Sequence, residues 1–194
     1  MRPWRAPLAC RMPDDNRPRA LFLVGFMGAG KTSVGRALAA RLKWRFVDLD
    51  DRIEAREGRT IREIFDQSGE AAFRKTESAE LRTLLKEIDE TATVAALGGG
   101  AFVQPDNAAL LRRVAAPVVF LDAPVETLSE RCSPAVGVRP LFRDPQSFRA
   151  LYEARRPVYM GATIRVDTAG KSVEAVADEI ISALGLKPES GELQ

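Results

Sequence analysis

The sequence predicts an α/β fold in which five parallel strands form one sheet and helices cover both of its faces. Short apolar runs alternate along the chain with amphipathic stretches of helical period. The first apolar run ends in a glycine-rich loop that opens directly into a helical pattern. A length of 194 residues and a hydrophobic fraction of 45% suit one domain with a substantial core. We therefore expect a single domain over residues 20–186, with right-handed connections between its strands.

The strands are expected where the apolar runs are shortest and most continuous. They are Ala20–Val24, Phe46–Val47, Val94–Leu97, Val118–Leu121 and Ile164–Val166. The helices are expected where apolar residues recur at helical spacing, and the second of these stretches is broken near Gly58 and Gly69. They are Lys31–Leu42, Asp51–Ile88, Asp106–Val114, Val125–Cys132, Ser147–Arg156 and Ser172–Leu184.

Both chain ends are predicted to be tails. Residues 1–19 combine several prolines with no apolar period, which indicates a disordered segment, and residues 187–194 are expected to fray. The net charge of +2 does not favour nucleic acid as a partner, and no apolar run is long enough to span a membrane. With no histidine, the chain cannot build a His-based catalytic triad. Its two cysteines lack a paired spacing, so we expect a reduced, cytoplasmic protein.

The strongest motif is the loop from Gly25 to Thr32, which reads G-F-M-G-A-G-K-T. Glycines let the backbone curl so that successive N–H groups point at phosphate oxygens, and the helix that follows adds unpaired donors. Lys31 is expected to reach the β- and γ-phosphates of a nucleoside triphosphate, and the Thr32 hydroxyl to ligate Mg²⁺. A plain glycine turn with a solvated lysine is the structural alternative. The motif does not say what accepts the phosphoryl group.

Two carboxylates follow the second strand, at Asp48 and Asp50. If the strand continued through them, alternation would point both side chains to the same side of the sheet. One carboxylate near the metal and one near an acceptor hydroxyl would serve phosphoryl transfer. The alternative is that Asp50 and Asp51 are simply N-cap and first-turn residues of the helix that follows.

Four further segments carry candidate ligand-binding residues. Arg74 and Glu77 lie three apart and can pair on one helix face, although a solvated surface pair has the same spacing. Gly98, Gly99 and Gly100 close the third strand, which favours close approach of a ligand to the backbone over a simple turn. The segment around Arg139 is rich in proline and reads as a mobile lid over phosphates. Arg155 and Arg156 end a predicted helix, where a cation is also ordinary.

Taken together, these motifs resemble the shikimate kinases over roughly residues 20–184. The phosphate loop, D-L-D at Asp48–Asp50, G-E-x-x-F-R-x-x-E at Gly69–Glu77, L-G-G-G-A, V-R-P-L and R-R-P-x-Y occur in the order and approximate spacing of that family. The resemblance implies a P-loop nucleoside monophosphate kinase-like fold. It places a substrate-binding helical region at about 51–88 and a lid at about 133–145. It also implies ATP as co-substrate, Mg²⁺ as cofactor and shikimate as the phosphoryl acceptor.

The resemblance also implies a role for each matching residue. Lys31, Asp50 and Arg139 would be catalytic, Thr32 and Asp48 would serve Mg²⁺, and Glu77 would orient Arg74. Shikimate would be bound by Asp50, Arg74, Gly99 and Arg155. The nucleotide would be held by Gly28, Ala29, Gly30, Lys31, Thr32, Ser33, Arg131 and Arg139, with Arg131 against adenine.

Asp122 ends a strongly apolar strand, which is also typical of a metal-binding aspartate. Asp122 together with Pro124 and Glu126 forms an acid, proline and acid signature of a helix N-terminus, which favours a helix-capping role instead. The expected activity is transfer of the γ-phosphoryl group of ATP to the 3-hydroxyl of shikimate by a monomer that binds neither nucleic acid nor membrane. The alternatives are a small P-loop kinase for gluconate or a nucleoside, and a non-catalytic ATP-binding homologue.

Overall fold

The computed structural model describes residues 18–88, 90–114, 116–132 and 144–187. Almost all of the two predicted tails, and most of the predicted lid including Arg139, lie outside the described residues.

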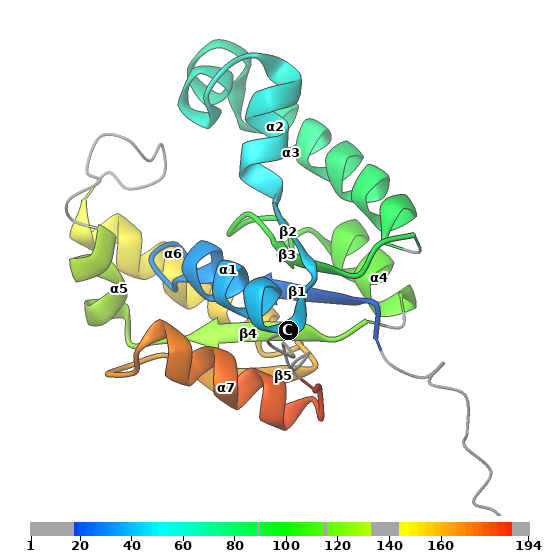
Figure 1. Ribbon diagram of the computed structural model, residues 1–194. Coiled ribbons are helices and arrows are strands. Elements are labelled where there is room, and N and C mark those ends of the chain that lie inside the picture. The colour runs from blue at the N-terminus through cyan, green and yellow to red at the C-terminus, as the bar shows by residue number, and fades with distance from the viewer. Residues whose placement is uncertain (1–17, 89, 115, 133–143, 188–194) are drawn as a thin grey trace, which may run out of the picture.

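Five parallel strands form one sheet in the order β2-β3-β1-β4-β5 (Figure 1). The predicted strands are confirmed, and each end agrees to within one residue. All five residues of β1 are buried, because this strand has neighbours on both sides and helices on both faces. The strands are β1 (Ala20–Val24), β2 (Arg45–Asp48), β3 (Thr93–Ala96), β4 (Val118–Asp122) and β5 (Ile164–Asp167).

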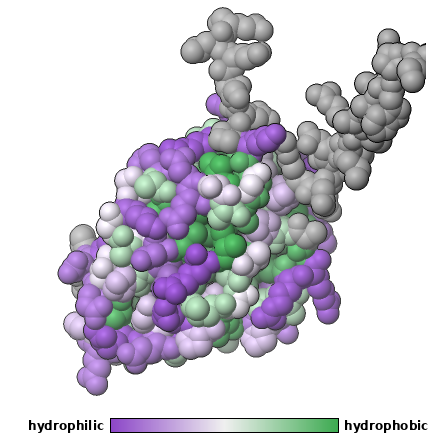
Figure 2. All heavy atoms as spheres, turned by 90° about the horizontal axis from the view of Figure 1, so that it is seen from below, coloured by the Kyte–Doolittle hydropathy of each residue, from purple (hydrophilic) through white to green (hydrophobic). Residues whose placement is uncertain are grey.

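The helices cover both faces of the sheet. In Figure 1, α1 and α7 lie together in front of the strands, while α4 and α6 lie behind them. Figure 2, seen from below, shows patches of hydrophobic side chains with hydrophilic ones between and around them. The helices are α1 (Lys31–Leu42), α2 (Leu49–Glu57), α3 (Ile61–Glu87), α4 (Pro105–Arg113), α5 (Val125–Cys132), α6 (Pro145–Tyr159) and α7 (Val173–Ala183).

Helices α2 and α3 extend beyond the sheet from the end of β2, at the top of Figure 1. Both predicted breaks are confirmed, since Gly58 caps α2 with φ 64° and Gly69 interrupts α3 with φ 78°. Thr60 and Glu63 form a capping box at the start of α3. The protruding pair therefore has defined ends.

Helix α6 runs to Tyr159, past the predicted end at Arg156. Proline usually ends a helix, and Pro157 lies inside this one. Contacts with the rest of the protein stabilise the last turn of α6. Tyr159 is fully buried, and its ring centroid lies 5.2 Å from that of Phe120. Its hydroxyl donates a hydrogen bond to the Gly99 carbonyl oxygen. Tertiary packing thus outweighs the local effect of the proline.

The chain reverses its direction of travel across the sheet at β1, which lies between β3 and β4. Open α/β sheets bind ligands at the carboxyl ends of their strands beside such a switch point. The phosphate loop, Asp48 and the three glycines all follow strand ends at this edge. Within the described residues no helix is both long and apolar enough to cross a membrane.

Candidate active site

A cavity of about 500 Å³ opens at this edge of the sheet. The phosphate loop forms one side, the start of α2 and the middle of α3 form another, and the glycine loop after β3 forms the floor. The residues that the family resemblance assigned to catalysis or to binding substrate, nucleotide or metal all line this cavity except Ala29, which is buried, and Arg139, which lies outside the described residues. Those it brings together are Gly28, Gly30, Lys31, Thr32, Ser33, Asp48, Asp50, Arg74, Gly99, Arg131 and Arg155.

The phosphate loop has the curled backbone that the motif predicts. Gly28 adopts φ 80°, and a β-carbon there would lie 2.8 Å from both Cys132 Sγ and the Leu128 carbonyl oxygen, so only glycine fits. Lys31 extends back over the loop, with Nζ 3.0 Å from the Gly25 carbonyl oxygen and 3.2 Å from that of Phe26. Helix α1 carries no acidic residue in its first turn. No acidic residue of α1 itself therefore offsets the positive end of the helix, which faces the cavity as an anion site requires.

Thr32 and Asp48 lie directly against each other. The Thr32 hydroxyl donates to Asp48 Oδ2 at 2.7 Å, while Asp48 Oδ1 accepts from the Asp50 amide and caps α2. A hydroxyl and a carboxylate side by side are hard oxygen donors of the kind that Mg²⁺ prefers when phosphates and waters complete its shell. The two residues therefore fit a nucleotide-bound Mg²⁺.

Asp50 occupies a different local structure from the one predicted. It does not continue β2, because the strand ends at Asp48 and Asp50 lies in the first turn of α2. The strand-alternation argument for its direction was therefore wrong, although its side chain does reach the cavity. Asp50 and Asp51 are both acidic residues of the first turn of α2, as the alternative interpretation held, but the N-cap itself is Asp48.

The Asp50 side chain is only partly exposed, and its Oδ1 atom is buried. Burial, followed by the nearby charge of Asp48, raises its pKa to about 6 against the opposing effect of Lys31. Its Oδ1 has no hydrogen-bond partner among the described residues. A pKa near neutrality is what a group that accepts a proton during turnover needs.

Arg74 and Glu77 form an ion pair at the cavity wall rather than a solvated surface pair. Arg74 Nη1 lies 2.8 Å from Glu77 Oε2, and the Glu77 side chain is fully buried. Burial raises the pKa of Glu77, and its Oε1 has no partner among the described residues. Glu70 also accepts from Arg74, at 3.2 Å from Nε and 3.0 Å from Nη2. Glu77 and Glu70 thus fix the guanidinium from two sides.

The sequence interpretation missed two of these partners. Glu70 could have been found, because it lies four residues before Arg74 on one helix face. Gln104, the N-cap of α4, donates a hydrogen bond to Glu77 Oε2 at 2.7 Å. The two residues are 27 positions apart in the sequence. No local pattern could have revealed that contact.

The glycine loop after β3 is pressed against the acidic and basic side chains of the site. A β-carbon on Gly98 would lie 2.7 Å from both Asp50 Oδ1 and Glu77 Oε1, and one on Gly100 would collide with the Arg74 guanidinium. Arg155, 8% exposed, approaches Gly99 from α6. The loop therefore lets ionisable side chains from three helices converge on one backbone segment.

Asp122 does not have the capping role that the sequence suggested. Its buried carboxylate pairs with Arg156 at 2.7 Å and Arg165 at 2.9 Å, joining α6 to β5. Arg156 therefore has a partner outside the cavity, while its neighbour Arg155 faces into it. Arg131 lies at the opposite end of the cavity, 3.1 Å from the Thr168 carbonyl oxygen and 3.4 Å from that of Gly28.

A phosphate loop after the first strand of a five-stranded parallel sheet, with a carboxylate and cations in the same cavity, defines a small P-loop kinase. A family model described as "Shikimate kinase" matches residues 27–185. The chain belongs to the shikimate kinase family.

Curated relatives match the sequence of this chain over most of its length. A shikimate kinase of Thermus thermophilus is 45% identical over 166 residues, covering 84% of this chain and 88% of its own. That of Geobacter sulfurreducens is 42% identical over 179 residues, covering 91% and 95%. The structure of Acinetobacter baumannii shikimate kinase in complex with shikimate superposes with a TM-score of 0.81 at 36% identity, covering 92% of this chain and 96% of that one. A gluconokinase from Sinorhizobium meliloti, at a TM-score of 0.58 and 20% identity, shares the fold alone.

Proposed function

We propose that the protein transfers the γ-phosphoryl group of ATP to the 3-hydroxyl of shikimate, giving ADP and shikimate 3-phosphate for the biosynthesis of aromatic amino acids through chorismate. Family membership supports the reaction. The observation that carries the residue roles is that Asp50 and Arg74, from two helices, line one cavity with Lys31 of the phosphate loop. We further propose that the protein acts as a cytoplasmic monomer.

On the nucleotide side, the backbone of Gly28–Ser33 would hold the phosphates at the positive end of α1. Lys31 would neutralise charge on the β- and γ-phosphates as the bond to the leaving oxygen breaks. Arg131 would lie against adenine, and Arg139 would reach the phosphates from the lid. When bound through Thr32 and Asp48, Mg²⁺ would polarise the phosphates and offset their charge.

On the acceptor side, shikimate presents one carboxylate and three hydroxyls. Arg74 and Arg155 are the cations of the cavity beside the glycine loop, and they would bind the carboxylate. Asp50 would accept a hydrogen bond from the 3-hydroxyl, whose oxygen forms the new bond to the γ-phosphorus while ADP leaves. The hydroxyl proton passes to Asp50, late in a loose transition state that needs little activation of the nucleophile.

The first test is ADP release from ATP and Mg²⁺, measured separately with shikimate, gluconate, a nucleoside and no acceptor. Turnover that depends on shikimate is the expected result. Faster turnover with gluconate or a nucleoside would contradict the assigned acceptor, and turnover without an acceptor would indicate an ATPase. If ATP binds but no acceptor supports turnover, the protein is a non-catalytic homologue.

Asp48→Asn should raise the Mg²⁺ concentration for half-maximal activity by about 10- to 100-fold, the scale on which altered site residues weaken metal binding. Asparagine preserves the N-cap of α2 but removes the charge that a hard cation prefers. Titration of Mg²⁺ at saturating ATP and shikimate measures the effect. Thr32→Val should act in the same direction and Thr32→Ser should not. An unchanged Mg²⁺ requirement in both Asp48→Asn and Thr32→Val would remove the metal role of this pair.

A further inference from the structure

Helix α2 carries Asp50 but has little apolar anchoring of its own. Only Leu49 and Ile53 among its nine residues are buried. A helix of this length spans about 13 Å, and two buried residues on one side do not by themselves fix its rotation about its axis. Its other contacts therefore decide where the Asp50 carboxylate points.

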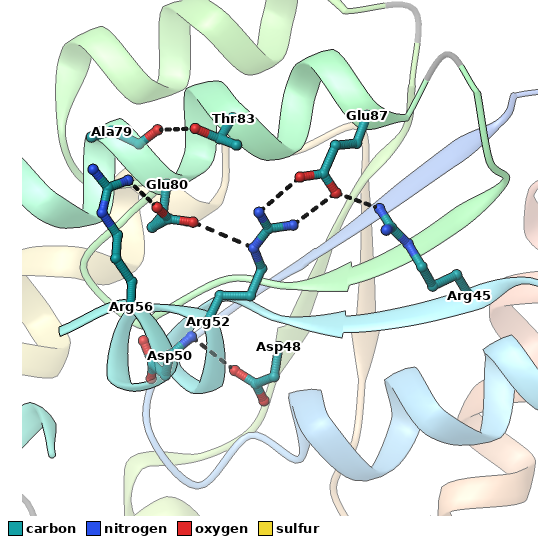
Figure 3. A network of polar contacts seen from close by, with 9 residues as sticks. All are labelled: Arg45, Asp48, Asp50, Arg52, Arg56, Ala79, Glu80, Thr83 and Glu87. Atoms are coloured by element: carbon teal, nitrogen blue, oxygen red, sulfur yellow. Dashed lines mark hydrogen bonds and ion pairs between the residues drawn. The ribbon is translucent and has the colours of Figure 1, made fainter. Parts of the chain in front are cut away.

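The two long faces of α2 meet different surroundings. Asp50 and Glu54 line the cavity, four residues apart on one face. Arg52 and Arg56 are also four apart, and they are directed at α3 (Figure 3). Because successive helical residues turn by about 100°, Arg52 lies roughly opposite Asp50 around the axis. Any rotation of α2 that moves Arg52 must move Asp50 as well.

Arg52 makes the most extensive contact between α2 and α3. Its Nη1 and Nη2 donate to the two carboxylate oxygens of Glu87 at 2.9 and 2.8 Å, and its Nε lies 3.4 Å from Glu80 Oε2 (Figure 3). The Glu80 side chain is 6% exposed and also pairs with Arg56. The hydrogen bond from Arg52 is the leading cause that lowers the pKa of Glu87 to about 2. A planar guanidinium held by two carboxylates permits one orientation, which a point charge would not impose.

Helix α3 is also the helix that carries Arg74 and Glu77. We propose that Arg52 is a positioning residue for phosphoryl transfer, which locks the rotation of α2 against α3 through Glu80 and Glu87 and so holds Asp50 at a fixed place relative to Arg74. The proposal rests on the proposed function, in which Asp50 receives the acceptor hydroxyl and Arg74 the acceptor carboxylate. It predicts a defect confined to the acceptor side of the reaction.

Arg52→Ala is expected to lower kcat/KM for shikimate about tenfold or more, with a fall in kcat, while KM for ATP changes by less than about twofold. Arg52→Lys keeps the charge but loses the two-pronged contact, and it should recover only part of the loss. The matched control is Arg45→Ala. Arg45 donates to the same Glu87 at 2.9 Å but from β2, so its loss leaves α2 joined to α3. Arg45→Ala should turn over like the unaltered protein.

Hydrogen exchange of the α2 amides gives a readout independent of activity. Exchange across α2 should be faster in Arg52→Ala than in the unaltered protein and in Arg45→Ala. Unchanged α2 exchange together with unchanged kcat/KM for shikimate would overturn the proposal, as would equal losses for shikimate and ATP. If the unaltered protein does not phosphorylate shikimate, the proposed function fails, and exchange alone then decides whether Arg52 fixes α2.

Discussion

Asp50→Asn is expected to lower kcat by about 10²- to 10⁴-fold, the contribution typical of a positioned acid–base group. Asparagine has nearly the same size, so it fills the same place in the first turn of α2. It cannot take up the hydroxyl proton, which then has no acceptor when the new bond to phosphorus forms. ATP binding should change little, because the proposed site for the nucleotide phosphates is the loop before α1. Steady-state kinetics and ATP binding, measured on the same preparation, check both statements.

Asp51→Asn is the matched control, since it makes the same change of charge at the next residue, which is exposed. It should retain most of the turnover. Near-normal turnover in Asp50→Asn would remove the assigned role of Asp50. A similar loss in both variants would instead indicate that the net charge of this turn matters more than one carboxylate.

Arg74→Ala is expected to raise KM for shikimate by at least about 30-fold, because removing one partner of a buried, hydrogen-bonded charge pair costs roughly 2–5 kcal/mol. The substrate carboxylate loses one of its two cations, and Glu77 loses the guanidinium that lies 2.8 Å from it. KM for ATP should change far less, because the loop that binds phosphate does not contact Arg74. Initial rates over a grid of both substrate concentrations measure the two constants together.

Arg74→Lys separates charge from geometry in the same site. Lysine retains the positive charge but cannot present two parallel donors, so an intermediate KM for shikimate is expected. Glu70→Gln is the control for the outer contact. The substitution removes the negative charge of Glu70, whose side chain is 54% exposed, and so weakens its ion pair with Arg74. A smaller rise in KM for shikimate than in Arg74→Ala is expected, because exposed ion pairs contribute little. Equal losses for shikimate and ATP in Arg74→Ala would show that the variant is misfolded.

The sequence predicted the sheet and the phosphate loop because these depend on local signals, whereas most other residues of the cavity lining were assigned through the family resemblance. Five apolar runs and a glycine loop in front of a helix leave few alternative arrangements. The direction of Asp50 could not be derived in the same way, because α2 begins immediately after β2 and replaces the two-residue alternation with a helical turn. The residue reached the cavity for a reason different from the one that the pattern suggested.

Contacts between segments that are far apart in the sequence could not be predicted from local sequence patterns. Asp122 looks like a helix cap in its local context, but its partners Arg156 and Arg165 come from a later helix and a later strand. Helix α6 continues past Pro157 because Tyr159, near its end, is buried in the core. Likewise, the helical pattern alone does not distinguish Arg155 from Arg156, since both end the same predicted helix; the family resemblance selected Arg155, which is the one that lines the cavity.

The glycine loop after β3 has a consequence for how the chain tolerates mutation. Alanine is ordinarily among the mildest replacements, but a methyl group at position 98 would press on Asp50 and Glu77, and one at position 100 on Arg74. Neither glycine offers a reactive group, yet each change would disturb residues that we propose bind or position the acceptor. In a screen of random substitutions, changes at these two glycines would therefore lower activity as strongly as changes at the proposed catalytic residues. Loss of activity alone would not distinguish a glycine that must lack a side chain from a residue that takes part in the reaction.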